Sequence, residues 1–337
     1  MNATAVTAHL HTLPELLALS ESVPSGFSPL SAEKFLLLDT EARTTRPADQ
    51  ARIAAWLRQL PCPTVGIAAA PAANAAADAC DVLLASLSEA APLIGNIRGN
   101  PIAATLLVQL LRLTETMPLA DALIAESLAY ATLQCGPEFR TWLTTHRAAS
   151  PAVPDDQGPA VVMQRDGDRL MLELNRASNR NGMSVEMRDA LVEALQLVLT
   201  DSTILSVRIS GRGKCFSIGG DLTEFGSTPD PATAHIVRSL ALPGRLLAQC
   251  AARTQVHVHG ACVGSGIEFP VFAGRVTAAR DAWFQLPEIG LGLIPGAGGC
   301  ISIPRRIGRQ RTAWLALSGK RIHAEQALEW GLVDAIA

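Results

Sequence analysis

Short hydrophobic runs alternate with stretches of helical spacing from residue 161 onward. Two such runs flank an Asp-Gly-Asp turn within 161–175, which predicts a hairpin of two strands. The segment 183–199 has apolar positions at helical spacing, and Ser184 is placed to cap its first turn. β-rich runs at 204–211 and 255–264 predict two further strands. This alternation predicts an α/β fold around a βαβ-type sheet.

The first part of the chain contains a similar pattern that later becomes purely helical. The hydrophobic runs 35–41, 64–70 and 81–86 predict strands, and 47–60 predicts a helix between the first two. From about residue 101 to residue 147 the apolar positions change to helical spacing. We therefore expect an α/β segment followed by a group of helices.

A stretch rich in Pro, Gly and acidic residues, AASPAVPDDQGPA at 148–160, separates the two hydrophobic regions. This composition is typical of a linker, and a chain of 337 residues is long enough for two domains. We expect an N-terminal region at 1–150, a linker at 151–160 and a second unit at 161–337.

Composition and charge exclude several classes of protein. With 48% hydrophobic and 18% charged residues, the chain can bury a large core and is not a disordered protein. A net charge of −3 leaves no electrostatic footprint for nucleic acid. No apolar run has the length of a membrane span, and the N-terminus lacks the features of a signal peptide. We expect a cytoplasmic protein without nucleic-acid or membrane partners.

The cysteines and histidines do not form the spacings of a metal site. Seven scattered cysteines with no CxxC pair argue against disulfides or zinc, so buried free thiols are expected. His257 and His259 alternate on a predicted strand, but no Asp or Cys stands nearby as a further ligand. We predict no metal site.

Two glutamates, Glu268 and Glu288, lie at the edges of the Gly-rich stretches HGACVGSGIEFP (259–270) and LPEIGLGLIPGAGG (286–299). Glu288 stands among leucines and isoleucines, and their burial of the carboxyl would raise its pKa toward the range used for proton transfer. The simpler alternatives are a first-turn Glu that complements a helix dipole for Glu268, and a solvent-facing loop Glu for Glu288.

Backbone amides next to these acids could bind a developing oxyanion. A β-run ends before the pair Gly219-Gly220, which leads into Asp221, and a helix is expected to begin near Ser265. Exposed N–H groups at both places would suit a carbonyl oxygen. For the Gly219-Gly220 segment, the alternative is an ordinary strand-to-loop turn that Asp221 fixes.

Taken together, these segments resemble the crotonase superfamily, the enoyl-CoA hydratases and isomerases. The segments that carry the resemblance are LNRASNRNGMSVEMRDAL, CFSIGGDLTEF, HGACVGSGIEF, LPEIGLGLIPGAGG and RRIGRQRTAWLALSGKRIHAEQALEWGLVD. The resemblance runs almost continuously over 161–337 and implies a (ββα)n spiral core, with the N-terminal α/β-plus-helical region as an addition.

Carried over by position, the resemblance implies a role for each of the four central residues. The amides of Gly220 and Ser265 would polarise the thioester carbonyl of an acyl-CoA. Glu268 would activate a water for attack at Cβ, and Glu288 would deliver a proton to Cα. No metal or other cofactor is implied, since coenzyme A belongs to the substrate. Further substrate-binding positions are Ile218, Gly219, Asp221, Leu222, Gly264, Pro295 and Gly296.

The chain also departs from the family pattern. Ser265 replaces the usual Gly at the second oxyanion position, and Phe269-Pro270 replaces small apolar residues. The chain stops where family members continue with closing helices, and 100–143 resembles that missing part. We expect the helices of 100–147, within a degenerate half of the same fold, to close this catalytic core or that of a neighbour. The run of arginines at 305–311 could meet CoA phosphates, a solvated face or a subunit contact.

The expected activity is syn addition of water to a 2-enoyl-CoA. The alternatives are a Δ3–Δ2 enoyl-CoA isomerase with Glu288 as its main base, a thioester hydrolase or C–C bond-cleaving enzyme of the same superfamily, and a non-catalytic acyl-CoA-binding scaffold. Both glutamates are present, which favours hydration. The family also implies a homo-oligomer, a trimer or hexamer.

Overall fold

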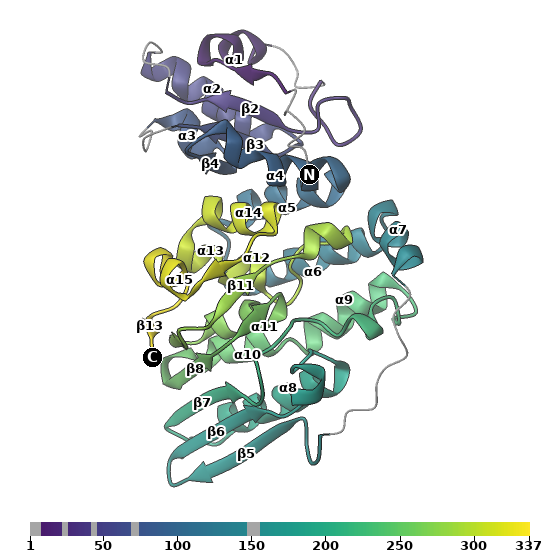
Figure 1. Cartoon of the computed structure of the whole chain (residues 1–337), viewed down its shortest axis with the longest axis vertical. Helices are drawn as coiled ribbons and strands as arrows, with labels where there is room; N and C mark the ends of the chain where they lie inside the picture. The colour runs from purple at the N-terminus through teal and green to yellow at the C-terminus, as the bar shows by residue number, and fades with distance from the viewer. Residues whose placement is uncertain (1–7, 22–25, 42–45, 69–73, 147–155) are drawn as a thin grey trace.

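The computed structural model describes residues 8–21, 26–41, 46–68, 74–146 and 156–337. Their strands form sheets of four, six and three strands. The four-stranded sheet lies at one end of the long axis, the hairpin of the six-stranded sheet lies at the other, and helices fill the space between them (Figure 1). The structure is therefore mixed α/β, as expected.

The N-terminal unit is a parallel sheet in the order β1-β2-β3-β4. The strands predicted at 35–41, 64–70 and 81–86 are confirmed over the residues described, as is the helix at 47–60. Strand β1 and two short helices were not predicted. The elements are β1 (Leu10–His11), α1 (Leu13–Leu19), β2 (Leu36–Asp39), α2 (Pro47–Gln59), β3 (Thr64–Ile67), α3 (Ala75–Ala79) and β4 (Val82–Leu84).

Both faces of this sheet are covered, which explains the uninterrupted leucines of β2. Leu36 and Leu38 pack with α1 and α2 in a core of their own. Leu37, on the other face, belongs to the main core, which continues through the next helices into the C-terminal part. The N-terminal sheet is thus packed onto the rest of the molecule.

The helical stretch predicted from residue 101 is confirmed over its described part. The helices are the short η1 (Leu87–Glu89), α4 (Ala90–Gly99), α5 (Pro101–Thr114), α6 (Leu119–Gln134) and α7 (Pro137–Thr145). Helices α4 and α5 pack against α14, and α6 packs against α9 and α12, which are C-terminal elements defined below. These helices therefore join the two sheet-bearing parts.

The C-terminal part holds a six-stranded sheet, β13-β10-β8-β7-β6-β5, in which only the β5–β6 pair is antiparallel. A three-stranded sheet, β12-β11-β9, lies beside it. The strands are β5 (Val161–Asp166), β6 (Arg169–Leu174), β7 (Ser206–Gly211), β8 (Thr254–Val258), β9 (Ala261–Val263), β10 (Arg275–Ala278), β11 (Trp283–Gln285), β12 (Ile322–His323) and β13 (Ala335–Ile336).

Helices connect these strands and cover the sheet. The predicted helix at 183–199 is confirmed, and the Ser184 side chain accepts a hydrogen bond from the Met187 N–H as its N-cap. The helices are η2 (Ala177–Asn179), α8 (Val185–Thr200), η3 (Leu222–Glu224), α9 (Pro231–Leu240), α10 (Pro243–Gln249), η4 (Ala251–Arg253), α11 (Ser265–Glu268), η5 (Pro270–Phe272), η6 (Glu288–Leu291), α12 (Gly299–Ser302), α13 (Pro304–Ile307), α14 (Arg309–Ser318) and α15 (Ala324–Trp330).

The single strand predicted at 255–264 is wrong, because two strands in different sheets take its place. The run 255–264 divides into β8, in the six-stranded sheet, and β9, in the three-stranded sheet. The chain turns at Gly260, whose φ is +55°, and a Cβ there would lie 2.4 Å from the Lys214 carbonyl oxygen. Only glycine fits this turn, and the turn directs β9 toward the candidate site.

The predicted linker is only partly described. Residues 151–155 of the linker lie outside the described residues. The described end is held to the C-terminal part, because the Asn175 side chain donates hydrogen bonds to the carbonyl oxygens of Gln157 and Pro159.

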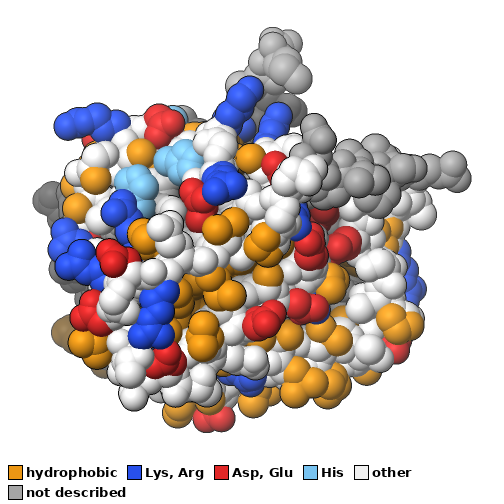
Figure 2. Space-filling view, turned by 90° about the horizontal axis from the view of Figure 1, so that it is seen from below, with side chains coloured by type: hydrophobic (Ala, Val, Ile, Leu, Met, Phe, Trp, Pro, Cys, Tyr) orange, Lys and Arg blue, Asp and Glu red, His pale blue; other side chains and the backbone are white. Residues whose placement is uncertain are grey.

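The cysteines agree with the sequence prediction except at one residue. All seven cysteines are unpaired, as expected, but Cys135 is exposed rather than buried. Among the described helices, none combines the length and hydrophobicity needed to cross a membrane. Figure 2 shows one end of the molecule, where acidic and basic side chains are interspersed with hydrophobic ones.

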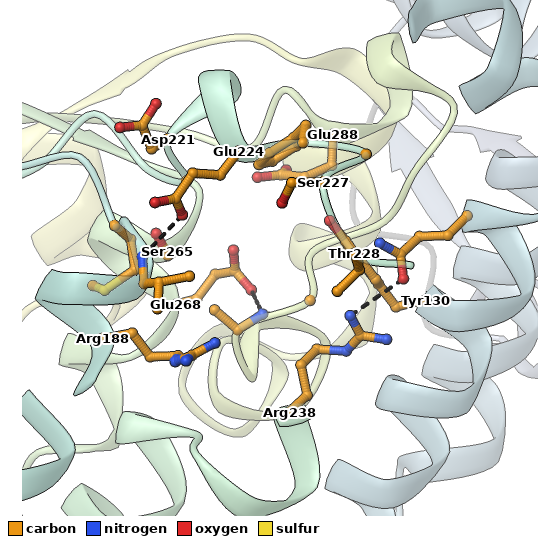
Figure 3. A pocket seen from close by; sticks show the side chains of 18 of the residues that line it. Tyr130, Arg188, Asp221, Glu224, Ser227, Thr228, Arg238, Ser265, Glu268 and Glu288 are labelled. Atoms are coloured by element: carbon orange, nitrogen blue, oxygen red, sulfur yellow. Dashed lines mark hydrogen bonds between the residues drawn. The ribbon is translucent and has the colours of Figure 1, made fainter. Parts of the chain in front are cut away.

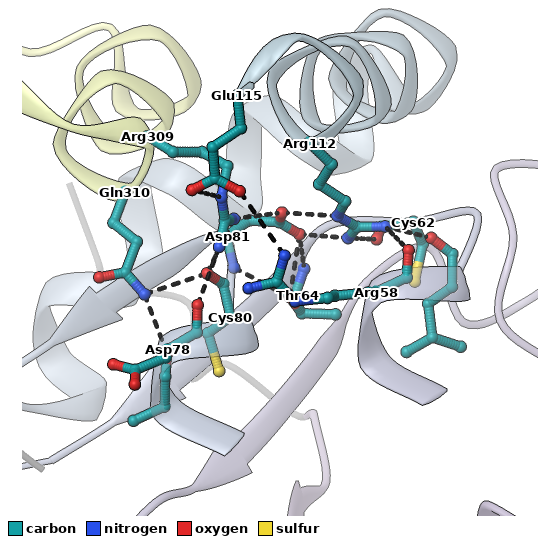
Figure 4. Close-up of polar contacts among 12 residues, drawn as sticks. Arg58, Cys62, Thr64, Asp78, Cys80, Asp81, Arg112, Glu115, Arg309 and Gln310 are labelled. Atoms are coloured by element: carbon teal, nitrogen blue, oxygen red, sulfur yellow. Dashed lines mark hydrogen bonds and ion pairs between the residues drawn. The ribbon is translucent and has the colours of Figure 1, made fainter. Parts of the chain in front are cut away.

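A buried ion-pair cluster joins the N-terminal sheet to the helices and the C-terminal part (Figure 4). Asp81, just before β4, accepts hydrogen bonds from Arg112 of α5 at 2.8 Å and from Arg309 of α14 at 3.1 Å. It also accepts from the N–H and hydroxyl of Thr64. Arg309 is therefore buried in a structural cluster, so the expectation of contact with solvent, a subunit or CoA phosphates is wrong for this one arginine of the run.

Substitution Asp81→Ala should lower the free energy of unfolding by about 3–5 kcal/mol, because two buried guanidinium groups lose their carboxylate. Denaturant unfolding would measure the change. Glu21→Ala is the matched control, since the exposed Glu21–Arg52 pair should contribute at most about 1 kcal/mol. Equally small effects of the two substitutions would show that the ion pairs of Asp81 do not contribute to the stability of the fold.

Candidate active site

A cavity of about 250 Å³ opens where the N-terminal helices meet the C-terminal part (Figure 3). Side chains or backbone from α6, α7, α8, η3, α9, α11 and η6 surround it. The lining residues are Tyr130, Gln134, Phe139, Met183, Val185, Arg188, Gly220, Asp221, Glu224, Phe225, Gly226, Ser227, Thr228, Arg238, Ser265, Glu268, Glu288, Gly296 and Ala297. All four residues predicted to carry the chemistry are among them.

Glu268 occupies the last position of α11 and is only 2% exposed. Its Oε2 accepts hydrogen bonds from the N–H groups of Ala297 at 2.7 Å and Gly299 at 3.0 Å. Burial raises the pKa of this carboxyl to about 7, although the amides oppose the shift. Its environment is therefore that of a group able to exchange a proton near neutral pH.

Glu288 begins η6 and faces the same space. Its Oε1 lies 2.5 Å from the position that a Cβ on Gly264 would take, and Oε1 of Glu268 lies 3.7 Å from that position. Its Oε2 is buried and has no hydrogen-bond partner among the described residues. Burial, and then the charge of Glu268, raise the pKa of Glu288 well above its usual value. Glu288 is thus not a solvent-facing loop residue.

Gly264 allows both carboxylates to converge. Its φ of +50° favours glycine, and any side chain would collide with the Glu288 carboxylate. The glycine precedes Ser265, so the same turn that admits the two acids also begins α11.

The two predicted oxyanion amides lie on adjacent segments. Ser217 pairs with Cys262 as an isolated bridge, which brings the loop after β7 beside β9. Gly219 then turns at φ +92° against the Val263 carbonyl oxygen, which a Cβ would approach to 2.7 Å. Within the described residues, the N–H groups of Gly220 and Ser265 donate no hydrogen bond to another protein group. Both residues line the cavity, so these donors are available to a ligand.

This arrangement combines two carboxyl groups of raised pKa with two backbone donors. Carboxyl groups of this kind can take and give protons. Backbone donors can stabilise negative charge that develops on a carbonyl oxygen. The site is therefore equipped for proton transfer at carbon next to a carbonyl.

The other predicted binding positions divide into two groups. Asp221 and Gly296 line the cavity, but Asp221 accepts hydrogen bonds from Thr223 and Asn179 as a residue that fixes its turn. The Leu222 side chain is 50% exposed. The residues that fall outside the cavity lining are Ile218, Gly219, Leu222, Gly264 and Pro295.

A third buried carboxylate, Glu126, comes from α6 and was not predicted. It accepts hydrogen bonds from the N–H groups of Gly298 at 2.7 Å and Cys300 at 2.8 Å. Glu126 and Glu268 thus share four consecutive amides, 297 to 300, in alternation. Burial, and then the charge of Glu268, raise the pKa of Glu126. A lone acid within the apolar run ALIAESLAY was the signal in the sequence.

Tyr130 lies one turn after Glu126 and covers Gly296, where a Cβ would be 2.3 Å from the tyrosine ring. The guanidinium of Arg238, from α9, also stacks on this ring, with its carbon 4.6 Å from the ring centroid. These two side chains form the wall opposite Ser265 in Figure 3. The sequence did not predict Tyr130 and Arg238 as site residues, because positions so far apart in the chain come together only on folding.

The His257 and His259 rings contact Thr277 and a backbone carbonyl respectively. Elsewhere in the described part, His9, His11 and Glu15 bring potential ligand atoms within 4.8 Å of one another. Glu15 already accepts hydrogen bonds from Thr12 as part of the α1 capping box. This group belongs to the N-terminal sheet and not to the cavity.

Substitution Glu126→Ala should lower the free energy of unfolding by at least about 2 kcal/mol, because two buried N–H groups lose their acceptor. Glu126→Gln keeps one acceptor and should have an intermediate effect. Denaturant unfolding would measure both, with Glu193→Ala, on the exposed face of α8, expected within about 0.5 kcal/mol of the original. An Ala variant as stable as the original would show that Glu126 does not hold the 297–300 segment.

Comparison with known proteins agrees with this geometry. The model of the enoyl-CoA hydratase/isomerase family matches residues 169–337. The chain is 33% identical over 183 residues to 2,3-dehydroadipyl-CoA hydratase of Escherichia coli (strain K12), covering 52% of this chain and 68% of that protein. It is 36% identical over 176 residues to 1,2-epoxyphenylacetyl-CoA isomerase of the same organism, covering 49% and 64%.

Solved structures show the same relation. The chain resembles the crystal structure of an enoyl-CoA hydratase/isomerase from Mycobacterium abscessus, with a TM-score of 0.50, 29% identity, and coverage of 53% of this chain and 70% of that one. The chain therefore spans about two thirds of the length of the proteins it matches. The crotonase fold expected for the C-terminal part is confirmed, and the chain belongs to the enoyl-CoA hydratase/isomerase family.

Proposed function

We propose that the protein adds water to the Cα=Cβ bond of a 2-enoyl-CoA and forms a 3-hydroxyacyl-CoA. The observation that carries the proposal is the convergence of two carboxyl groups, Glu268 and Glu288, over Gly264. Hydration needs one group to take a proton from water and one to give a proton to carbon. A pair of acids facing one space can do both.

The amides of Gly220 and Ser265 would receive the thioester carbonyl oxygen. Attack at Cβ moves negative charge onto this oxygen, and two donors placed in advance stabilise the enolate. Loss of one such donor in comparable sites costs about 3–4 kcal/mol of barrier. The absence of protein acceptors for these two N–H groups, within the described residues, supports this role.

Glu268 would hold and deprotonate the water. Its Oε2 is fixed by Ala297 and Gly299, which leaves Oε1 on the side of Glu288 to accept a hydrogen bond. A pKa of about 7 lets the group act as a base near neutral pH.

Glu288 would deliver the proton to Cα. Ionised Glu268 disfavours ionisation of its neighbour, so Glu288 keeps its proton while Glu268 is charged. Both acids lie on one side of the space over Gly264, which supports delivery of water and proton to the same face of the double bond.

Isomerisation is the second candidate. Oε2 of Glu288 is buried and has no hydrogen-bond partner in the described part of the chain, so this one carboxyl could carry a proton between two carbons of the acyl chain. One of the relatives is a 1,2-epoxyphenylacetyl-CoA isomerase, whereas another is a 2,3-dehydroadipyl-CoA hydratase. Hydration is favoured because hydrogen bonds hold Glu268 in place beside Glu288, so that a second carboxyl faces the same space.

Substitution Glu268→Gln should reduce hydration by about 100- to 10,000-fold, because it removes the base but retains an acceptor for Ala297 and Gly299. The assay is a panel of 2-enoyl-CoA thioesters analysed by mass spectrometry for the gain of one water. Glu193→Gln is the control for a surface carboxylate. An unchanged product mass, with a double-bond shift that survives Glu268→Gln, would favour the isomerase instead.

The rate should also depend on pH in a bell-shaped manner. As pH falls through about 7, Glu268 takes up a proton and the base is lost, so kcat/KM should fall. As pH rises above the raised pKa of Glu288, the acid is lost and kcat/KM should fall again. A rate that stays flat between about pH 5.5 and 8.5, with the fold intact by fluorescence, would contradict this assignment.

A further inference from the structure

We propose that Arg238 forms a subsite for a carboxylate at the far end of the acyl group, so that the preferred substrate is an ω-carboxy-2-enoyl thioester. This inference rests on the proposed function, because it assigns the end of the acyl chain relative to the reacting carbons. The residues that build it are Arg238 and the α6 residues around it.

Arg238 is the last basic residue of α9 and is half-buried at the meeting point of two cavities. It lines the active-site cavity of about 250 Å³ and a second cavity of about 210 Å³ between α6, α9 and α10. Gly296 also lines both. Figure 3 shows the guanidinium pointing into the active-site cavity beside Tyr130.

The guanidinium has only neutral hydrogen-bond partners among the described residues. It donates to the Ser127 hydroxyl at 3.2 Å, to the Ser127 carbonyl at 3.3 Å and to the Gln134 side-chain oxygen at 3.3 Å. These bonds use three of the five N–H donors of an arginine and leave two. No described carboxylate lies within 4.0 Å of it, whereas Arg188, also in the cavity wall, pairs with Asp189.

The buried acid whose charge acts on Arg238 makes no direct ion pair with it. The carboxylate of Glu126 accepts hydrogen bonds from the N–H groups of Gly298 and Cys300 and none from the Arg238 guanidinium, so its charge acts on Arg238 only at a distance. Burial lowers the pKa of Arg238, yet an arginine remains charged at neutral pH. A half-buried cation without a direct ion pair favours binding of an anionic ligand group, because the ligand then supplies the missing carboxylate partner.

The position of Arg238 corresponds to the end of the acyl chain. The amides of Gly220 and Ser265 would fix the thioester carbonyl, and the two glutamates would fix Cα and Cβ. In Figure 3, Glu268 lies between Ser265 on one side and Tyr130 with Arg238 on the other. The carbons beyond Cβ therefore run toward Arg238 and away from the thioester.

The other charged groups around the cavity do not compete for this ligand. Glu224 is on the far side of the cavity from Arg238 in Figure 3, and it accepts a hydrogen bond from the Val185 N–H. Arg188 is paired with Asp189 at 2.7 Å. His235 shares the Ser127 hydroxyl with Arg238, so it adds to the polar character of this end.

The test compares two 2-enoyl-CoA thioesters of equal chain length, one ending in a carboxylate and one in a methyl group. The ratio of their kcat/KM values should favour the carboxylate, and Arg238→Met should reduce this ratio by about 10- to 100-fold, the range for a hydrogen bond to a charged group. Arg238→Lys keeps the charge without the planar fork and should give an intermediate ratio. Arg245→Met is the matched control, because Arg245 lines only the second cavity.

Other roles of Arg238 give different results. If Arg238 only holds α9 against α6, Arg238→Met lowers both kcat/KM values by the same factor, and the proposal is overturned. If it binds a CoA phosphate, the loss disappears with N-acetylcysteamine thioesters, which lack phosphate, and the proposal is again overturned. A wild-type ratio that favours the methyl-ended thioester also overturns it.

Failure of the proposed function can be recognised separately. Binding of the saturated carboxylate-ended and methyl-ended acyl-CoA, measured by calorimetry, needs no hydration. A preference for the carboxylate-ended ligand that Arg238→Met removes supports the subsite even where neither enoyl thioester gains water. Equal affinities of the two ligands for the wild-type protein overturn the subsite even where both are hydrated.

Discussion

The site depends on how four consecutive backbone amides are satisfied at the start of α12. Glu268 accepts from residues 297 and 299, and Glu126 accepts from residues 298 and 300. A buried N–H without an acceptor costs free energy, so both carboxylates stabilise the folded conformation of residues 297–300. One of the acids proposed for catalysis is thereby oriented by the same contacts that hold the segment behind it.

This sharing also explains why the two halves of the chain form one site. Glu126, Tyr130 and Gln134 come from α6, in the N-terminal region, and they contact or line the cavity of the C-terminal part. Asp81 fixes the N-terminal sheet to α5 and α14 through two arginines. The N-terminal region therefore supplies walls to the site in the same chain. That its helices replace the family's C-terminal ones remains a hypothesis.

Much of the fold followed from local pattern. The helix at 183–199, its Ser184 cap and the leucine-rich strand β2 were predictable because periodicity and capping act over a few residues. The predicted strand at 255–264 failed because alternating apolar residues do not reveal a change of sheet at Gly260. Arg309 was misread for a similar reason, since its partner Asp81 is more than two hundred residues away.

The sequence by itself determined the chemistry that the site can hold: two glutamates beside glycine-rich turns and, through these motifs, the family. It did so because the glycines mark backbone turns that no other residue fits, as at Gly264. Only the tertiary structure decided what surrounds the acids. Glu126, Tyr130 and Arg238 reach the site through packing of α6 against α9 and α12, and long-range contacts of this kind leave no periodic signal along the chain.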